Sequence, residues 1–289
     1  ATELPPDALR VLEAERARKR RFTINLVIVF IAIFITLGVV LWLLGIDVKF
    51  MFGWLDFILT GVGYTLLVSA AAITLATILA LFGALGRLSR NPIANAISTF
   101  YVSLVRGTPL LVQVYMWYLA LPQIGHSLER LGFPQLRKAL TLQAIPAGIL
   151  ALGVCYGAYM TETFRAGIQS ISKGQTEAAY ALGMTPAQTM RRIILPQAIR
   201  VIIPPIGNEF VAMTKDSSLV SVMGVWELTF RATKIGRRYF RSLEMLLVAA
   251  AIYWVMTIIL QTLQSRLESY LARGRRSVSY THLTLPTKA

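Results

Sequence analysis

Long apolar runs separated by short charged segments dominate the chain. Six such runs follow one another, at residues 24–44, 57–86, 93–121, 142–160, 201–225 and 245–263. A helix rises about 1.5 Å per residue, so roughly 20 apolar residues span a hydrocarbon core about 30 Å thick. The pattern therefore predicts an all-α integral membrane protein with about six transmembrane helices packed as a bundle.

Two of these runs contain residues that do not suit an uninterrupted apolar helix. In the third, Pro109 of the segment Arg106-Gly107-Thr108-Pro109 lacks a backbone N–H, which predicts a break in mid-span. The fifth contains the helix-breaking pair Pro204-Pro205 and four polar or charged side chains, Asn208, Glu209, Lys215 and Asp216. An Arg or Lys at the centre of a bilayer costs about 2.5–3.5 kcal/mol, so these residues require partners or a polar cavity.

Composition supports a membrane protein and argues against a nucleic-acid partner. Hydrophobic residues make up 55% of the 289 positions and charged residues only 15%, whereas an ordinary soluble domain has roughly 25% charged residues. Most of the 29 Lys and Arg residues lie in the gaps between apolar runs, not on one basic face. We therefore interpret them as signals that orient the chain in a membrane.

The distribution of these cations predicts which side of the membrane the termini occupy. Eighteen Lys and Arg residues fall in the segments expected on the cytoplasmic side and nine on the opposite side. Five of the nine lie between residues 231 and 241, so this external loop is an exception to the positive-inside rule. The sequence predicts a multi-pass protein of the cytoplasmic (inner) membrane with both termini in the cytoplasm.

The two ends of the chain lie outside the repeating pattern. Residues 1–23 are a basic segment expected in the cytoplasm, and residues 24–44 are an extra N-terminal transmembrane helix. A cleavable signal peptide is the alternative for 24–44, but this run is longer than a usual signal and Leu44-Gly45-Ile46 is a poor cleavage site. Residues 277–289 lack helical periodicity and are interpreted as a non-native or disordered tail.

A motif occupies the polar stretch between the fourth and fifth runs. It reads E-A-A-x3-G-x9-I-x-L-P and consists of Glu177, Ala178, Ala179, Gly183, Ile193, Leu195 and Pro196. Ser172 followed by Gln175 can cap a helix here, and Gly183 permits the left-handed or tight turn that ends it.

A second short helix is expected directly after this turn. Thr185 can cap it, with proline at 186 in the first helical position and Gln188 three residues after the cap. Pro196 is expected to stop this helix. The two helices and their glycine elbow would present four apolar side chains to a partner: Ala178, Ala179, Leu182 and Met184. A connector that lies on the membrane surface is the alternative.

The motif resembles the cytoplasmic signature loop of permeases in ATP-binding-cassette (ABC) importers. Residues 106–113 (RGTPLLVQ) and 215–220 (KDSSLV) are similar to segments typical of bacterial permeases for polar amino acids. This resemblance covers roughly residues 57–272 and implies a type I importer permease domain, with a coupling loop at about 163–200. It also implies that the seven motif residues couple the permease to an ATPase.

The resemblance implies partners as well. In this family a homodimer or heterodimer of permease subunits pairs with two ATPase subunits and receives its amino acid from an extracytoplasmic binding protein. The sequence itself contains no ATP-binding P-loop, because no lysine follows a glycine and the pattern G-x-x-x-x-G-K-[ST] is absent. ATP and Mg are therefore expected in the partner subunit.

We expect no catalytic residue, metal or cofactor in the chain itself. Its one cysteine, Cys155, and two histidines, His126 and His282, do not form a familiar metal site. The sequence Gly153-Val154-Cys155-Tyr156-Gly157 imitates a nucleophile elbow, but close packing of small residues between helices explains it better.

Two interpretations remain open for the polar residues within the membrane. In one, four residues line a polar cavity where broken helices meet a zwitterionic amino acid: Thr108, Gln113, Asn208 and Glu209. In the other, Arg106, Lys215 and Asp216 pair with one another or near headgroups and stabilise the bundle.

The external loop 231–241 would attract an acidic amino acid or an acidic face of a binding protein. An ion-coupled transporter leaves the motif unexplained, and a membrane-embedded enzyme would require a nucleophile or metal site.

Overall fold

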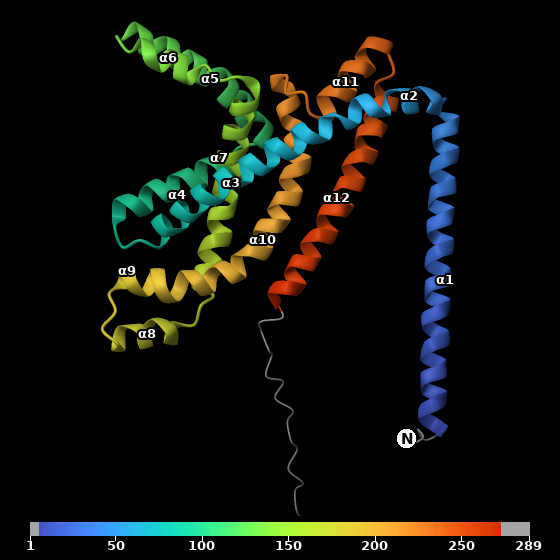
Figure 1. Cartoon of the computed structure of the whole chain (residues 1–289), viewed down its shortest axis with the longest axis horizontal. Helices are drawn as coiled ribbons and strands as arrows, with labels where there is room; N and C mark the ends of the chain where they lie inside the picture. Colours follow the sequence, from blue (N-terminus) through green and yellow to red (C-terminus); the bar gives the residue numbers. More distant parts are fainter. Residues whose placement is uncertain (1–5, 273–289) are drawn as a thin grey trace, which may run out of the picture. The chain divides into compact units, whose positions relative to one another are not determined.

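The computed structural model describes residues 6–272, and all regular structure within that range is helical. The predicted all-α fold class is therefore confirmed (Figure 1). The chain divides into two units, residues 1–52 and 53–289. The tail predicted at 277–289 lies outside the described residues.

The first unit consists mainly of α1 (Pro6–Leu43), a continuous helix that begins well before the predicted start at residue 24. The segment Ala17–Leu43, which is long and apolar enough to cross a membrane, contains no buried residue. Apolar side chains such as Phe30 and Phe34 are exposed along its length. A helix that is apolar on all sides suits a lipid environment. The Asp47 carboxylate accepts from the Phe50 N–H at the start of α2 (Val48–Leu59), which continues into the second unit.

Two helices form the centre of the second unit: α3 (Gly61–Leu88) and α7 (Ala144–Gln169). They share the most extensive helix–helix contact in the described chain. Small residues permit this approach: Ala76 is fully buried, and a methyl group at Gly153 would lie only 2.6 Å from the Cδ2 atom of Leu75. Such contacts drive helix association in lipid, where apolar side chains gain little by leaving the bilayer. The predicted small-residue packing is confirmed.

The third apolar run forms two helices, as the proline predicted. α4 (Pro92–Arg106) ends at the break, and α5 (Leu110–Arg130) begins directly after Pro109. Asn91 caps α4, its Oδ1 atom accepting from the Ile93 N–H at 2.9 Å. After α5 the chain turns at Gly132 into the short helix α6 (Pro134–Leu140).

The fifth run corrects the prediction that Pro204-Pro205 break a helix. Both prolines lie inside α10 (Leu195–Asp216), which is continuous. Prolines are tolerated in membrane helices where neighbouring helices support the backbone. Here Gln264, on α12 (Ser242–Ala272), donates from Nε2 to the Pro204 carbonyl at 3.5 Å. A 3₁₀ turn, η2 (Ser217–Met223), and the helix α11 (Leu228–Tyr239) connect α10 to α12.

Four described segments are long and apolar enough to cross a membrane, fewer than the six runs predicted. They are Ala17–Leu43, Gly61–Leu88, Ala144–Gln169 and Ser242–Tyr270. The two runs without such a segment are the third, which is divided at Gly107, and the fifth, whose helix contains Glu209, Lys215 and Asp216. The chain is a multi-pass membrane protein in which two of the predicted spans are interrupted or polar.

Candidate coupling loop and polar sites

The first helix of the motif loop, α8 (Lys173–Ala181), ends as the glycine predicted. Gly183 has a φ of 76°. Glycine adopts this left-handed conformation easily, whereas it is unfavourable for any residue that has a side chain. Its N–H donates to the Tyr180 carbonyl at 2.9 Å, and the Met184 N–H donates to the Ala179 carbonyl at 3.1 Å. These two bonds satisfy carbonyl groups at the end of the helix, in the pattern of a Schellman motif.

The start of α8 differs from the prediction in one respect. Ser172 occupies the N-cap position, but its side chain forms no capping hydrogen bond. The backbone closes this turn instead, because the Gln175 N–H donates to the Ser172 carbonyl at 3.0 Å. The Gln175 side chain lies near a different residue, Gln197 on α10, at 3.4 Å.

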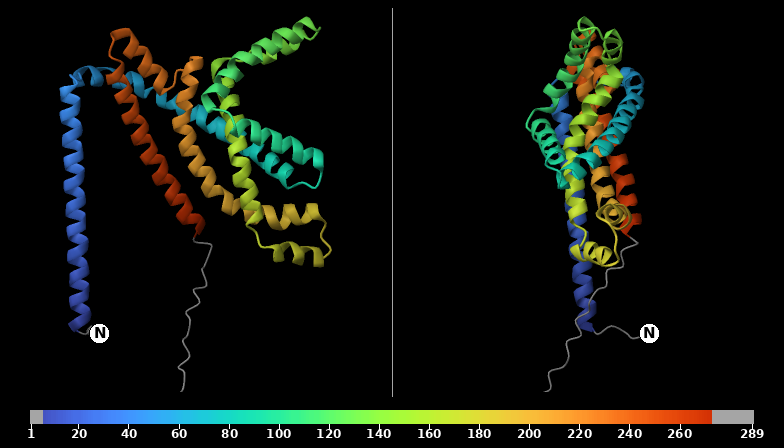
Figure 2. Two further views of the ribbon diagram at one scale, coloured as in Figure 1. Left: turned by 180° about the vertical axis from the view of Figure 1, so that it is seen from behind. Right: turned by 90° about the vertical axis from the view of Figure 1, so that its left-hand side faces the viewer.

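The second helix, α9 (Pro186–Thr189), begins with the predicted capping box. The Thr185 Oγ1 atom accepts from the Gln188 N–H at 3.3 Å, and the Gln188 Oε1 atom accepts from the Thr185 N–H at 2.9 Å. This reciprocal pair satisfies two backbone donors that the helix itself leaves free. Figure 2 and Figure 1 both show α8 and α9 side by side at one end of the second unit.

Pro196 does not stop the second helix, contrary to the prediction. A π-helical turn, η1 (Met190–Ile194), connects α9 to α10, and Pro196 is the second residue of α10. In this turn the Leu195 N–H bonds the Met190 carbonyl five residues earlier. A π-turn and an early helical position together accommodate a residue without an N–H donor. The loop is therefore continuous with a helix of the bundle.

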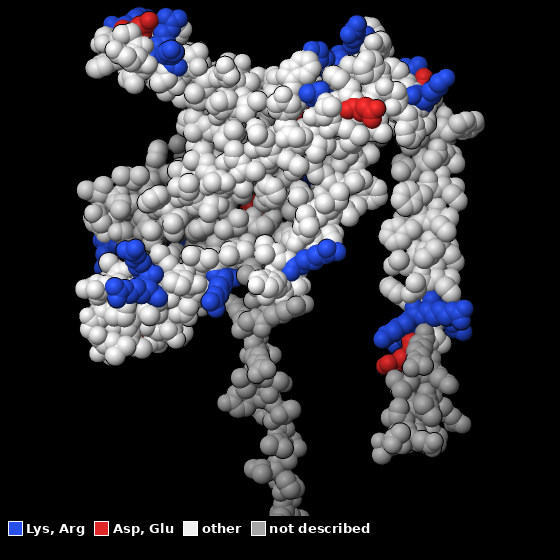
Figure 3. Space-filling model, in the orientation of Figure 1, with Lys and Arg blue, Asp and Glu red and all other residues white. Residues whose placement is uncertain are grey.

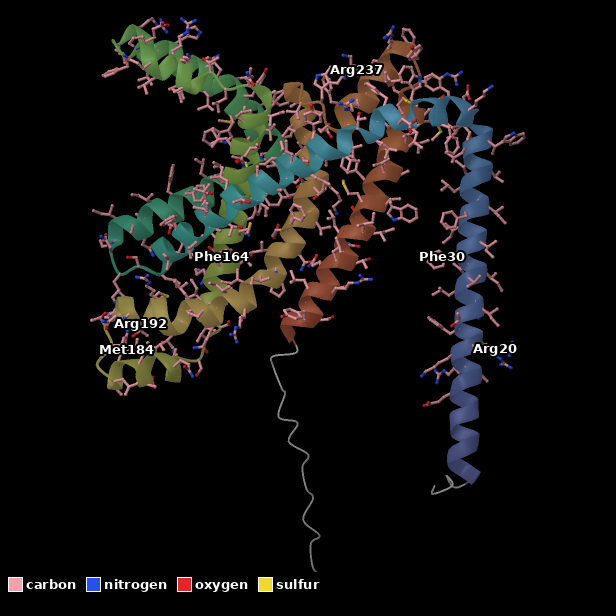
Figure 4. All side chains as sticks on the ribbon, in the orientation of Figure 1. Arg20, Phe30, Phe164, Met184, Arg192 and Arg237 are labelled. Atoms are coloured by element: carbon pink, nitrogen blue, oxygen red, sulfur yellow. The ribbon has the colours of Figure 1, made fainter. Side chains whose placement is uncertain are left out.

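The motif residues separate into an exposed set and a packed set. Glu177, Ala178, Gly183 and Pro196 are exposed, whereas Ala179 is buried and Ile193 and Leu195 pack against the core. The prediction that Ala179 faces a partner is wrong, because α8 turns this side inward. The apolar surface of the elbow is instead Leu182, which is 83% exposed, and Tyr180, which is 48% exposed. Figure 4 marks the half-buried Met184 and the exposed Arg192 at this end of the unit.

A second site lies at the break between α4 and α5. The Gln113 amide Nε2 lies 2.7 Å from the Val105 carbonyl, 3.0 Å from the Thr108 carbonyl and 2.8 Å from the Thr108 hydroxyl. The Thr108 Oγ1 atom also donates to the Leu104 carbonyl at 3.1 Å. Both side chains therefore bond carbonyl groups that a continuous helix would have satisfied.

Gln113 also connects this break to α7. The Cys155 thiol, fully buried, donates to Gln113 Oε1 at 2.7 Å, and the Tyr101 hydroxyl of α4 donates to the Val154 carbonyl at 2.6 Å. A cavity of about 270 Å³ beside the break includes Thr108 and Gln113 in a mostly apolar lining. Asn208 and Glu209 are not among its lining residues, so the four predicted pathway residues do not share this cavity.

The polar residues of α10 form a separate group. Glu209 and Asp216 are seven residues apart, which places them on one face of the helix. The Tyr156 hydroxyl of α7 donates to Asp216 Oδ2 at 2.7 Å. Asn208 is exposed. No sequence pattern indicates the role of Tyr156, because this contact joins residues 60 positions apart.

Arg106, Lys215 and Asp216 do not pair with one another, so this part of the second interpretation is wrong, whereas a position near lipid headgroups stays a prediction. Within residues 6–272 no ion pair joins them, and Lys215 is exposed. The Arg106 guanidinium lies 5.7 Å from the centre of the Tyr159 ring instead. The ion pairs that join helices lie elsewhere: Glu162 of α7 contacts Arg87 of α3 at 3.1 Å, and Glu129 of α5 contacts Arg137 of α6 at 2.8 Å. Glu162 also contacts Arg165 of its own helix at 2.7 Å.

The opposite end of the second unit contains a buried carboxylate that sequence reasoning missed. Glu227 is fully buried and caps α11, its carboxylate accepting from the Thr229 and Phe230 N–H groups at 2.8 and 2.7 Å. It also accepts from the Tyr253 hydroxyl of α12 at 2.7 Å. Burial raises the pKa of Glu227, although these hydrogen bonds act in the opposite direction. Glu is not among the usual N-cap residues, so the sequence does not indicate this cap.

A multi-pass helical bundle with polar groups between its helices, and a capped helix pair at one end, has the architecture of a membrane transport subunit. Comparison with known proteins gives the particular family. Residues 72–273 match the family of binding-protein-dependent transport system inner membrane components, and the chain belongs to this family. Members are permease components and are not themselves catalytic.

Similar proteins agree with this assignment and support the resemblance to amino-acid permeases. The chain is 36% identical to the probable amino-acid permease protein YxeN of Bacillus subtilis (strain 168), over 80% of this chain and 99% of that protein. It is 37% identical to the L-cystine transport system permease protein TcyB of the same organism, over 74% of this chain and 87% of that protein. A crystal structure of an amino acid ABC transporter with histidines matches with 37% identity and a TM-score of 0.68, over 78% of this chain and 99% of that one.

Proposed function

We propose that this chain is the membrane-spanning subunit of an ATP-driven importer for polar amino acids. Residues 57–272 are its permease domain, and the loop at about 163–200 transmits force from a separate ATPase subunit that binds ATP and Mg. Residues 1–23 and 24–44 add a basic cytoplasmic segment and one extra transmembrane helix. A second permease subunit and an extracytoplasmic amino-acid-binding protein complete the assembly in the bacterial inner membrane.

The geometry of the motif loop is the observation that carries this proposal. Two short helices are fixed by a Schellman turn at Gly183 and a capping box at Thr185, so the elbow between them has a defined shape. Its exposed apolar side chains, Leu182 and Tyr180, suit insertion into a groove of a partner. Because η1 joins the loop directly to α10, a push on the elbow would move a helix of the bundle.

The polar groups of the bundle support transport of a polar solute, with different roles at the two sites. We propose that Thr108 and Gln113 hold the break between α4 and α5 in shape, because their polar atoms already bond protein groups. Asn208 and Glu209 are the better candidates for contact with the amino acid, since neither forms a hydrogen bond to another described side chain. Asp216 and Arg106 would position Tyr156 and Tyr159 nearby.

Reconstitution of the subunits tests the proposal. The purified chain should hydrolyse no ATP by itself, and ATP-driven uptake of a polar amino acid should require both a separate ATPase subunit and the binding protein. A cysteine at Leu182, introduced with Cys155→Ser, should crosslink to the ATPase subunit. Serine preserves the donor to Gln113, so the background stays folded. Uptake driven by a sodium or proton gradient without ATP would refute the proposal.

A cysteine at Leu131 is a suitable control for the crosslink. Leu131 is 72% exposed, a large apolar side chain like Leu182, but it lies between α5 and α6 and outside the loop. Crosslinking from 182 and none from 131 is the expected result. Equal crosslinking from both positions would show random contact, not docking.

A further inference from the structure

α11 presents a face of exposed positive charge. Lys234, Arg237 and Arg238 are exposed and follow the spacing i, i+3, i+4, which places them on one side of the helix. α11 contains no acidic residue. Figure 3 shows Lys and Arg side chains gathered over α11, and Figure 4 marks Arg237 at the end of the unit opposite Met184 and Arg192.

The other two cations of this loop have structural partners. Arg231 donates from Nε to the Trp226 carbonyl at 3.0 Å, and its guanidinium lies 5.0 Å from the centre of the Phe57 ring. Arg241 contacts Glu244 at 2.9 Å. By contrast, among the residues whose side chains are described, no ion pair involves Lys234, Arg237 or Arg238. Arg231 and Arg241 therefore contribute to the fold, whereas Lys234, Arg237 and Arg238 are available to a partner.

Aromatic side chains lie beside the free cations. The Lys234 ammonium lies 3.9 Å from the centre of the Trp226 ring, and the Arg238 guanidinium 5.5 Å from that of Tyr239. Trp226 and Tyr239 are 39% and 41% exposed. Aromatic residues and Arg are enriched at the energetic centres of protein–protein interfaces. The composition of this face is therefore that of a protein-binding surface.

The apolar side of α11 is not available to lipid. Leu228, Ala232 and Ile235 are buried against α3 and α12, and a methyl group at Gly236 would lie 2.7 Å from the Ser242 Cα atom. A helix that binds a membrane surface inserts its apolar side between the headgroups. Phe240, directly after α11, is exposed, but α11 itself has no apolar side free to insert. An acidic protein therefore fits the basic face better than an anionic membrane does.

We infer that the face formed by Lys234, Arg237 and Arg238 is the docking surface for an acidic patch on the extracytoplasmic amino-acid-binding protein. This inference rests on the proposed function, which supplies the binding protein as a partner. Complementary charge accelerates association and selects the orientation of docking. Two hydrogen bonds hold the start of α11 in place for docking. The Leu228 N–H donates to Thr65 Oγ1 of α3 at 3.4 Å, and the Tyr253 hydroxyl of α12 donates to Glu227.

The test uses the complete transporter in liposomes with the purified binding protein of the same uptake system. In the double variant Arg237→Glu/Arg238→Glu, the binding-protein concentration for half-maximal uptake should rise about tenfold at low ionic strength, because charge reversal slows association. The rise should shrink in about 0.3 M salt, where the charges are screened. The neutral variant Arg237→Gln/Arg238→Gln should show a smaller rise.

The matched control is Arg130→Glu/Lys138→Glu, which reverses the same amount of charge at two exposed residues of α5 and α6. It should leave the half-maximal concentration within about twofold of the original. Equal effects of the two double variants, or no effect of Arg237→Glu/Arg238→Glu, would overturn the inference. So would an effect that follows the phosphatidylglycerol content of the liposomes and not the binding-protein concentration. ATP hydrolysis and uptake by the unsubstituted complex report on the proposed function separately.

Discussion

The two ends of the second unit are built on different principles. The loop with α8 and α9 obtains its shape from neighbours in sequence: a glycine at 183 and a capping box at 185 and 188. The end with α11 obtains its shape from distant residues, because Glu227 bonds Tyr253 of α12 and a methyl group at Gly61 would lie 2.8 Å from the Leu228 backbone nitrogen. One end is encoded locally and the other by tertiary packing.

This difference suggests how each end responds to change. A locally encoded loop can change its docking properties while the bundle remains folded, which suits a part that moves with an ATPase. An end fixed by buried hydrogen bonds is rigid, and its loss should destabilise the helices that it joins.

The largest expected effect concerns the side of the membrane that each end occupies. Thr185 belongs to the loop with α8 and α9, and Ser127 of α5 is predicted on the same side of the membrane as α11. Single cysteines at these two exposed positions should react with an impermeant reagent from opposite faces of the membrane in a variant that lacks Cys155. The basic residues near both termini favour a cytoplasmic position for Thr185. Labelling of both cysteines from one face would contradict the proposed topology and the separation of the two ends.

The next effect is on stability at the α11 end. Glu227→Leu removes the acceptor for two backbone N–H groups and the Tyr253 hydroxyl, so the free energy of unfolding should fall by about 3 kcal/mol. Glu227→Gln keeps one acceptor oxygen and leaves one of the two acceptor positions as an NH2 group, so it should cost less than Leu, about 1–2 kcal/mol. Thermal unfolding of the full chain in detergent measures both. Equal losses for Leu and Gln would show that the buried hydrogen bonds do not fix this end.

A smaller and more local effect is expected at the other end. Thr185→Ala removes the capping hydroxyl and should cost about 1 kcal/mol within α9. Hydrogen exchange of the α9 amides should accelerate while the thermal midpoint of the bundle stays the same. Thr185→Ser retains the hydroxyl and is the control. Destabilisation of the whole bundle by Thr185→Ala would mean that this loop is not a locally encoded element.

The smallest effect is a dependence of stability on pH. The pKa of Glu227 is raised in the folded protein, so protonation of this carboxylate stabilises the fold. This stabilisation is fully present below the unfolded pKa of about 4.3 and is lost as the pH rises through the higher pKa of the folded protein. As the pH rises through this window, the free energy of unfolding should fall slightly more for the unsubstituted protein than for Glu227→Gln. The difference should be at most about 1.4 kcal/mol per pH unit. Parallel pH profiles of the two proteins would contradict this.

The same contrast explains which features were predictable from sequence. The apolar runs, the break at Pro109, the turn at Gly183 and the capping box depend on nearby residues, and the structure contains all of them. Their physics is local, because a missing N–H or a positive φ acts within one or two helical turns.

The wrong predictions concern prolines and residues whose partners are distant. Pro196 and Pro204-Pro205 lie within a continuous helix, because a π-turn and the packing of α12 accommodate them. Gln113 and Asp216 each bond a residue of α7, Cys155 and Tyr156, and no spacing in the sequence indicates these contacts. The roles of Asn208 and Glu209 stay predictions for the same reason.

The central claim is that the elbow at Gly183 couples the permease to an ATPase, and one pair of variants tests it most directly. Gly183 and Gly132 both have positive φ, 76° and 95°, and neither has a neighbour within 4 Å of an added methyl group. Aspartate at either position therefore introduces similar backbone strain, of order 1–3 kcal/mol, but only Gly183→Asp alters the loop. We expect normal membrane abundance for both variants, normal uptake by Gly132→Asp and a sharp fall in uptake per ATP hydrolysed by Gly183→Asp. Normal coupling in Gly183→Asp would contradict the account.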